Sequence, residues 1–366
     1  MPPAALTRRQ FLRLTAGLGA GAVIGTPPFL AGCLHAPPSG AAPLWHTPSA
    51  TPALVAAAQG TDLYEMTRTA LAGLGGIAQV VAPGHTVFIK PNLLTAGLGR
   101  GEPTQTGEIA KPEIIIATAE ECLRAGAAHV IIGDGAQVRQ FDWEELRTLD
   151  GRTHLAAEAA RLNAAYDGTV TLACLNVDSP AWDPLPSPRT NLGHIYASSL
   201  VARADRIISI PVLKTHRLAR LTLSMKNFMG VTPIAMYGGG SERTGRSRLH
   251  LAAGGLESCF LDICDALRPD LAIIDASIGC EGYGPWVRPR EGRRVDLRER
   301  LGAWLVLAGT DPVATDATAA RIISHDVTRV PHLLRAYEEG LGQIQPELIT
   351  LTGAALDELR MDWDPI

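Results

Sequence analysis

The chain has 366 residues, which is long enough for a sizeable hydrophobic core and for one large or two smaller α/β domains. Its composition is that of an ordinary globular protein, with 46% hydrophobic residues, 19% charged residues and a formal net charge of -4. Because the chain has neither a basic surplus nor a basic run with interleaved aromatic residues, its composition argues against nucleic acid as a partner.

The first 33 residues are expected to be an export signal rather than part of the fold. Arg8 and Arg9 form a twin arginine ahead of an apolar, Gly- and Ala-rich segment, which is typical of bacterial twin-arginine export. The segment ends in LAGC at 30–33, which resembles a lipobox whose cysteine, Cys33, is acylated. We therefore predict the twin-arginine translocation machinery as a partner, a periplasmic or cell-envelope location and a lipid anchor in the membrane. A plain export signal or an uncleaved anchor is the alternative.

Residues 34–58 are rich in Pro, Ala and Ser and are expected to form a tether, which leaves 59–366 as an α/β domain. No apolar run after the signal approaches the roughly 18 residues that a membrane span needs. Twin-arginine export moves folded proteins, many of which carry a cofactor. The route therefore favours a bound metal or organic cofactor, although some cofactor-free proteins also use it.

Cysteine usage narrows the choice of cofactor. Five cysteines follow Cys33, and none forms a C-x-x-C pair, which argues against an iron–sulfur cluster or a structural zinc site and leaves a divalent metal open. Most of them lie within apolar segments and are expected to be small buried hydrophobic residues, and the odd number leaves at least one thiol unpaired, or none paired at all. They are Cys122, Cys174, Cys259, Cys264 and Cys280.

Apolar, β-branched runs alternate with helical patterns along the chain. The predicted strands cover Thr86 to Ile89, His129 to Ile132, Val170 to Val177, Arg206 to Leu213, Leu271 to Ile274 and Ala303 to Leu307. The predicted helices cover Leu63 to Val81, Pro112 to Ala125, Trp143 to Asn163, Leu192 to Ala204, Leu256 to Leu267 and Pro312 to Ile323. This alternation predicts an α/β fold with a largely parallel sheet of about six or more strands, helices on both faces, and one or two lobes.

Polar side chains follow the predicted strands at the point where each strand ends. The carboxyl ends of parallel strands form the ligand crevice in such sheets, so we expect these side chains to meet there. They are Lys90 and Asn92, Asp134, Lys214 and His216, and Asp275 with the later Glu281. Turn formation and helix capping are the alternative for the acidic residues, but they do not explain the lysines.

Lysine is rare in this chain, which has only four among its 33 Lys and Arg residues. Three of them, Lys90, Lys214 and Lys226, sit beside apolar runs and next to Asn or His. An amine is a compact donor that can lose its proton when desolvated, unlike a guanidinium, so these positions are candidates for an anion clamp, an acid/base or a covalent adduct. Structural ion pairs with Asp134 or Asp275 are the alternative.

These patterns assign provisional roles. Catalysis is assigned to Lys214, His216 and Lys226; substrate binding to Lys90, Asn92 and Asn227; and metal binding to His250, Asp134, Asp275 and Glu281. Two functions stay open: a cofactor- or metal-dependent enzyme acting on a small anionic molecule, and an accessory protein that binds an anion or a metal without turnover.

Several motifs together resemble those of the domain-of-unknown-function family 362. They are IKPN at 89–92, ADRIISIPVLKTH at 204–216, MKNFMG at 225–230, the segment from IID to EGYGP at 273–285, and AGTDPVATD at 308–316. The resemblance runs from about residue 60 to about residue 350. The family as a whole is uncharacterised. Many of its members carry ferredoxin-type cysteine clusters, which this chain lacks, so an iron–sulfur role is not carried over.

A fainter resemblance links the chain to the nickel-pincer lactate racemases. The order of His216, Lys226 and His250 is similar to theirs, and it implies a proton carrier, the attachment point of a thioamide-linked pyridinium cofactor and a nickel ligand, respectively. The chain departs from that family at the earlier strand end, where Asp134 lies in the neighbourhood of an expected histidine.

Overall fold

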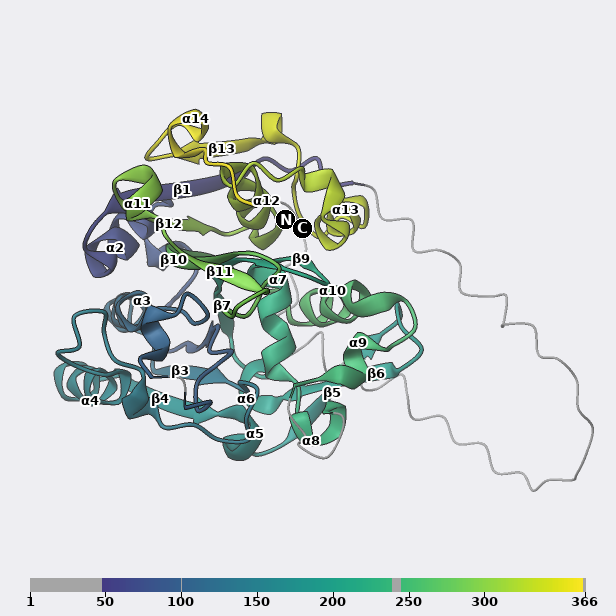
Figure 1. The fold of residues 1–366 in the computed structure, drawn as a ribbon. Coiled ribbons are helices and arrows are strands. Elements are labelled where there is room, and N and C mark those ends of the chain that lie inside the picture. The colour runs from purple at the N-terminus through teal and green to yellow at the C-terminus, as the bar shows by residue number, and fades with distance from the viewer. Residues whose placement is uncertain (1–47, 100, 239–244, 365–366) are drawn as a thin grey trace, which may run out of the picture.

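The computed structural model describes residues 48–99, 101–238 and 245–364. Its centre is an 11-stranded sheet with the main order β13-β1-β12-β10-β7-β2-β3-β4, and β8, β9 and β11 branch from it (Figure 1). The strands are β1 (Ala53–Gly60), β2 (Thr86–Pro91), β3 (His129–Asp134), β4 (Thr169–Cys174), β7 (Arg206–Ile210), β8 (Val212–His216), β9 (Arg220–Thr222), β10 (Leu271–Gly282), β11 (Gly292–Asp296), β12 (Trp304–Gly309) and β13 (Ile349–Thr352). A separate hairpin pairs β5 (Trp182–Ser187) with β6 (Gly193–Ser198).

The strands β10, β7, β2, β3 and β4 pair in parallel, as do β1 and β13. Strand β12 is the exception on the main path, because it runs antiparallel to both β1 and β10. The connection from β10 to β12 holds β11 and the short helix α11 (Arg298–Leu301) rather than a long crossover helix, so β12 returns beside β10 in the opposite direction.

Successive side chains of the central strands enter two separate cores. In β2, Val87 and Ile89 join one buried cluster while Phe88 joins the other, as the two-residue period of a strand requires. Helices α2 (Leu63–Gly73), α3 (Pro112–Arg124) and α4 (Leu155–Ala165) cover the first face, and α10 (Gly255–Leu267), α12 (Pro312–Ile322) and α13 (Pro331–Glu338) cover the second. The predicted fold class, a largely parallel α/β sheet with helices on both faces, is confirmed.

Short helices occupy the connections between the longer elements. They are α5 (Leu175–Asp178), α6 (Ser199–Ala202), α7 (Ser224–Asn227), α8 (Ile234–Tyr237), α9 (Ser247–His250) and α14 (Leu356–Leu359), with 3-10 turns η1 (Ile77–Gln79), η2 (Pro103–Gln105), η3 (Trp143–Glu145), η4 (Phe228–Val231), η5 (Val327–Arg329) and η6 (Pro346–Leu348). Of these, α7 matters most for the site described below, because it carries Lys226.

Several predicted elements differ from the structure. The helix expected over 63–81 ends at Gly73, the strand expected over 206–213 is divided into β7 and β8 at Pro211, and the strand expected to end at Ile274 continues to Gly282. The helix expected over 192–204 is mostly strand β6, in which Ile195 and Ala197 are buried while the residues between them are more exposed, so the period is two rather than 3.6. The strand expected over 170–177 ends at Cys174 and continues as α5. The helix expected over 143–163 splits into η3 and α4, because α4 begins only after His154 caps it.

The predicted tether is too long at its end, since Ala53–Gly60 is strand β1. This strand pairs with β12 on one side and with β13 on the other, so it is an integral part of the sheet. Residues 34–47, the predicted signal over 1–33 and Cys33 lie outside the described residues. Within the described part of the chain, none of the helices is long and apolar enough to cross a bilayer. The five later cysteines are buried, as expected, and all are free thiols.

Candidate functional site

A cavity of about 470 Å³ lies at the carboxyl ends of β2, β3 and β8. Lys90, Lys214 and Lys226 all line it, so the convergence of lysines that the sequence predicts is present. We call it the lysine cavity. Other lining residues that matter below are Asn92, Asp134, His216, Leu218, Thr222, Asn227, Gly230, Arg246, His250 and Leu251.

The β8–β9 hairpin supplies three of these side chains from one face. Lys214 and His216 are two residues apart in β8, and Thr222 stands opposite Lys214 in β9. Strand alternation places all three on the cavity side. Thr215, between the two cavity residues, points the other way, and its hydroxyl donates to the carbonyl oxygens of Cys280 and Gly282. The hydrogen bonds of Thr215 on the opposite face therefore hold the hairpin in place and, with it, the side chains that line the cavity.

Lys90 is fully engaged within the protein. Its Nζ lies 2.6 Å from Asp134 Oδ1 and donates to Pro91 O at 2.8 Å and to Asn227 Oδ1 at 3.2 Å. Burial lowers the pKa of Lys90, and the Asp134 carboxylate raises it again. With two hydrogen bonds and an ion pair to protein oxygens, Lys90 matches the structural ion pair that the sequence left as the alternative. Its role in substrate binding stays a prediction.

Gly230 allows the Lys90–Asp134 pair to lie against the backbone. A Cβ atom at position 230 would lie 2.3 Å from Asp134 Oδ1 and 2.8 Å from Lys90 Nζ. Any other residue would therefore push the two charges apart. The glycine of the MKNFMG segment is explained by this close approach.

Two asparagine amides join the lysines into one network. Lys214 Nζ donates to Asn92 Oδ1 at 2.7 Å and to Glu108 O at 2.6 Å. Asn92 Nδ2 and Lys90 Nζ both donate to Asn227 Oδ1, and Asn227 Nδ2 donates back to Lys90 O at 2.7 Å. Asn92 and Asn227 thus hold the lysines in place rather than offering their amides to a ligand. Their substrate-binding role stays a prediction.

Lys226 differs from the other two lysines of the cavity. It is half-buried, and within residues 48–99, 101–238 and 245–364 its Nζ makes neither a hydrogen bond nor an ion pair. Burial lowers its pKa to about 8, and the nearby Arg246 guanidinium contributes to this shift. Burial also lowers the pKa of Lys214, to about 7. Lys226 is therefore the lysine of the described cavity that is available to a ligand, and the exposed Arg217 is a second cationic group among the lining residues.

The two histidines flank this amine. His216 Nδ1 accepts hydrogen bonds from the backbone N–H groups of Leu218 and Ala219, both at 3.1 Å, so the neutral ring carries its proton on Nε2. Burial and the charge of Lys226 hold the pKa of His216 well below its usual range. This arrangement favours hydrogen-bond donation over the predicted proton-carrier role. Burial likewise lowers the pKa of His250 to about 4.

Several side chains of the cavity were not singled out as site residues from the sequence, among them the buried Arg246 and Thr222. Arg246 is buried, and its guanidinium donates to the carbonyl oxygens of Thr232, Ala136 and Gly135. It therefore links its own segment to the loop after β3 and to the segment after η4. Thr222 is also buried, and its Oγ1 has no hydrogen-bond partner within the described structure. The only sequence signal for Thr222 is its place opposite Lys214 in a hairpin, and that pairing is visible only once the hairpin has been recognised.

The predicted metal set does not come together. Asp275 Oδ2 accepts from Lys111 Nζ at 3.2 Å, and Glu281 Oε1 accepts from Arg293 Nε at 2.8 Å and from Arg300. Neither acid lines the lysine cavity, whereas Asp134 and His250 do. Throughout the described segments, no group of three or more His, Cys, Asp and Glu side chains is placed to hold a metal ion.

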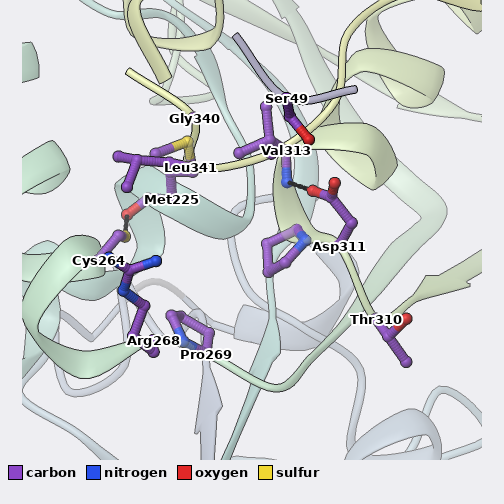
Figure 2. Close-up of a pocket in the computed structure, with 12 residues that line it drawn as sticks. Ser49, Met225, Cys264, Arg268, Pro269, Thr310, Asp311, Val313, Gly340 and Leu341 are labelled. Atoms are coloured by element: carbon purple, nitrogen blue, oxygen red, sulfur yellow. Dashed lines mark hydrogen bonds between the residues drawn. The ribbon is translucent and has the colours of Figure 1, made fainter. Parts of the chain in front are cut away.

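A second cavity, of about 260 Å³, lies against the other side of α7 (Figure 2). Met225, Cys264, Leu341 and Val313 give it a largely apolar wall, and Asp311 caps the helix α12 beside it. The Asp311 carboxylate is already engaged, because it accepts from the backbone N–H groups of two residues of α12 and of Gln343. This cavity lacks the convergent donors of the first.

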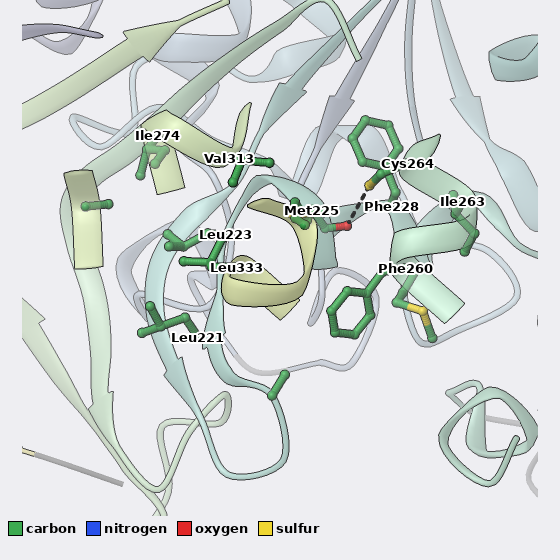
Figure 3. Close-up of a cluster of buried hydrophobic side chains, with 14 of the residues drawn as sticks. Leu221, Leu223, Met225, Phe228, Phe260, Ile263, Cys264, Ile274, Val313 and Leu333 are labelled. Atoms are coloured by element: carbon green, nitrogen blue, oxygen red, sulfur yellow. Dashed lines mark hydrogen bonds between the residues drawn. The ribbon is translucent and has the colours of Figure 1, made fainter. Parts of the chain in front are cut away.

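Helix α7 is held rigidly between the two cavities. Its Met225 and the neighbouring Leu223 and Phe228 insert among Phe260, Ile263 and Leu333, and Met225 O accepts from Cys264 Sγ (Figure 3). At the N-terminus of α7, the buried Asp316 carboxylate of α12 accepts from the backbone N–H groups of Ser224 at 2.9 Å and Met225 at 3.2 Å. Asp316 therefore positions the helix turn that carries Lys226.

Comparison with known proteins gives both sequence and structural relatives. The thylakoid-associated protein sll1697 of Synechocystis is 27% identical over 295 residues, which cover 78% of each chain. The lactate racemase apoprotein of Thermoanaerobacterium thermosaccharolyticum is 12% identical, with a TM-score of 0.35, over 62% of this chain and 51% of that one. A Thermotoga maritima protein of known structure is 13% identical, with a TM-score of 0.34, over 76% of this chain and 58% of that one. This chain thus spans between half and three fifths of each of these two solved structures.

The profile of the family described as a domain of unknown function, DUF362, matches residues 87–321. The match covers β2 to α12, so it contains all the residues that line the lysine cavity. On this evidence the chain belongs to the DUF362 family.

Proposed function

We propose that this protein is an exported cell-envelope enzyme that acts on a small anionic molecule bound in the lysine cavity, with Lys226 as the reactive amine. The observation that carries the proposal is the state of Lys226. Its amine is half-buried, has no protein partner within the described residues, and has its pKa lowered to about 8. Perturbed amines in clefts are typical of catalytic sites.

The groups left for a ligand are mainly donors, which supports an anion. They are the Lys226 amine, the third N–H of Lys214, the Thr222 hydroxyl, the protonated Nε2 of His216 and the exposed Arg217 guanidinium. The carboxylate among the lining residues is that of Asp134, and it is paired with Lys90. A carboxylate or phosphate group would satisfy these donors and offset the mutual repulsion of the cations. The volume of about 470 Å³ falls within the range of small-molecule sites.

The chemistry follows from the protonation of the amine. With a pKa of about 8, roughly a tenth of Lys226 is unprotonated at pH 7, and this fraction of the amine can take a proton or add to a carbonyl carbon. Addition to a carbonyl forms a C–N bond, and loss of water then gives an imine. Lys214 and His216 would stabilise the negative charge that develops on the carbonyl oxygen.

The proposed location rests on the N-terminal sequence and on the relative. The twin arginine at Arg8 and Arg9 and the lipobox-like cysteine Cys33 support export and a lipid anchor. The relative from Synechocystis is described as thylakoid-associated, which supports a membrane-associated location for this chain. Anchoring through Cys33 would make that association peripheral.

A cofactor related to that of the lactate racemases is a second candidate, favoured by one observation: His216, Lys226 and His250 line the same cavity. Lys226 would hold such a group, and His250 would offer its imidazole to the metal. The group would supply the nickel and the pyridinium ring. The His216 Nδ1 bonds and the Asp134–Lys90 pair depart from that arrangement, so this candidate has less support than the free amine.

The test of the proposal is chemical labelling of the purified full chain. Incubation with pyridoxal 5′-phosphate followed by borohydride reduction should modify Lys226 selectively, and inorganic phosphate should protect it. Peptide mass spectrometry identifies the labelled lysine, with Lys90 as the internal control because its protons are engaged. Equal labelling of all lysines, or none at Lys226, would overturn the role of the amine.

Protein isolated from its native host distinguishes the remaining alternatives. Elemental analysis and an absorbance spectrum should show a protein without nickel and without a near-visible band. Nickel together with such a band would replace the free-amine proposal by the pincer group. Labelling of Lys226 only above about pH 10 would show that the amine stays protonated at neutral pH. That result would favour a binding protein without turnover.

A further inference from the structure

We infer that the molecule bound in the lysine cavity is an amphiphile, whose anionic group lies at the cavity floor and whose apolar chain leaves past Leu218 and Leu251. This inference rests on the proposed anion site and adds the class of molecule. It comes from the way burial orders the lining residues.

Three donors of the cavity lie deep within it. Lys214 is 0% exposed, Thr222 3% and His216 5%. The two leucines that line the same cavity are the opposite, because Leu218 is 61% exposed and Leu251 85%. The cavity therefore passes from a polar floor to a rim that carries both leucines, with the exposed Arg217 next to Leu218.

The leucines reach this rim from separate parts of the chain. Leu218 lies in the turn between β8 and β9, two residues after His216, whose Nδ1 accepts from the Leu218 N–H. Leu251 follows α9 and has the highest exposure of the large hydrophobic residues in the described structure. Single exposed leucines are ordinary, but two at the mouth of one charged cavity indicate a surface that a ligand covers.

Further apolar residues extend the wall from the rim inward. Leu94, Met229, Pro285 and Trp286 line the same cavity. An anion such as inorganic phosphate would leave this wall in contact with water. A molecule with an alkyl chain or an apolar ring would cover it, and each methylene group so buried should raise the affinity about three- to fourfold.

The experiment compares a series of ligands that share one head group. Binding of inorganic phosphate, butyl phosphate and octyl phosphate to the full chain carrying Cys33→Ser, which removes lipid attachment, is measured by isothermal titration calorimetry. We expect the affinity to rise at least tenfold from phosphate to octyl phosphate. The double variant Leu218→Ser/Leu251→Ser should lose most of this gain and retain the affinity for inorganic phosphate.

The control variant is Leu192→Ser, which removes an exposed leucine that lies outside the lining of the lysine cavity. It should bind octyl phosphate as the parent does. Equal affinity for phosphate and octyl phosphate would overturn the amphiphile and leave the anion site standing. Absence of binding by every member of the series, phosphate included, would count against the anion site itself.

A vesicle assay separates the ligand from a membrane surface. The same Cys33→Ser chain is sedimented with phosphatidylcholine vesicles containing phosphatidylglycerol. If the leucine double variant loses vesicle binding while its affinity for octyl phosphate is unchanged, the leucines contact the membrane and the inference is wrong. Loss of octyl phosphate affinity in the double variant, with vesicle binding unchanged, supports it.

Discussion

Lys90 and Asp134 form a buried ion pair with 2.6 Å between Nζ and Oδ1. This pair distinguishes Lys90, a structural lysine, from Lys226, the proposed reactive lysine. Both side chains of the pair are almost completely buried, at 1% and 3% exposure. Removing one partner leaves the other charge buried and unpaired, which is far more costly than removing a charge that has no partner.

Lys90→Met should therefore destabilise the protein by about 3–5 kcal/mol, measured as the free energy of unfolding in guanidinium chloride. Lys226→Met is the matched control, because it removes an amine without a protein partner in the described structure and should change the stability by less than about 1 kcal/mol. A Lys90→Met protein as stable as Lys226→Met would show that the pair does not hold the site together.

Gly230→Ala should destabilise the same pair by steric contact. The added Cβ would lie 2.3 Å from Asp134 Oδ1, which forces the carboxylate or the backbone to move, at a cost of about 1–3 kcal/mol. Gly302→Ala provides the comparison, because Gly302 has a φ of 73° but open space around it, so only backbone strain is expected. Thermal unfolding of both variants measures the difference, and a smaller loss at Gly230 than at Gly302 would contradict the explanation.

Asp316→Ala should impair Lys226 without touching the cavity. The substitution leaves the backbone N–H groups of Ser224 and Met225 without their acceptor, so the α7 turn should loosen and labelling of Lys226 by pyridoxal 5′-phosphate should fall severalfold. Asp316→Asn keeps one acceptor oxygen and should recover part of the labelling. Asp311→Ala removes the cap of α12 instead and should lower stability while leaving the labelling of Lys226 intact.

The affinity for phosphate should fall as the pH rises through about 7 to 8. Binding favours protonated Lys214 and Lys226, whose pKa values are about 7 and about 8, and each proton lost above these values lowers the affinity up to tenfold per pH unit. Calorimetry from pH 6 to pH 9 measures this slope, and Lys226→Met should remove the step near pH 8. A flat profile would contradict it.

The stability of the free protein should change in the opposite sense. Between about pH 8 and the ordinary lysine pKa of about 10.4, the unfolded chain still holds the proton that folded Lys226 has released. The unfolded state therefore binds more protons, and the contribution of this residue to the free energy of unfolding rises with pH in that window. The difference between parent and Lys226→Met denaturation curves at pH 7 and pH 10 isolates this contribution.

Much of the fold could be predicted because its central strands are continuous apolar runs. Val87 to Ile89 and Ile273 to Ile274 are buried on both faces of the sheet, which is what such runs indicate. Strand β1 escaped prediction because its sequence, ALVAAAQG, is half alanine and follows a Pro- and Ser-rich stretch. Its pairing with β12 and β13 supplies the stability that its composition does not indicate.

The site could be predicted only where residue type was informative. The scarcity of lysine pointed to Lys214 and Lys226, whereas Arg246 looked like any other arginine of this chain. Asp275 and Glu281 were misplaced because β10 does not end at Ile274. The strand continues to Gly282, where it pairs with β11, and this continuation keeps both acids within the strand and away from the crevice. Strand length depends on such long-range pairing.

Strand β1 also constrains the order in which the protein can be completed. It is the first strand of the described chain, yet both of its neighbours, β12 and β13, belong to residues 304–352. During synthesis on the ribosome, the edges of β1 stay unpaired until β12 and β13 have been translated. Closure of the sheet is therefore a late step, which has to wait for strands that lie far from β1 in the sequence.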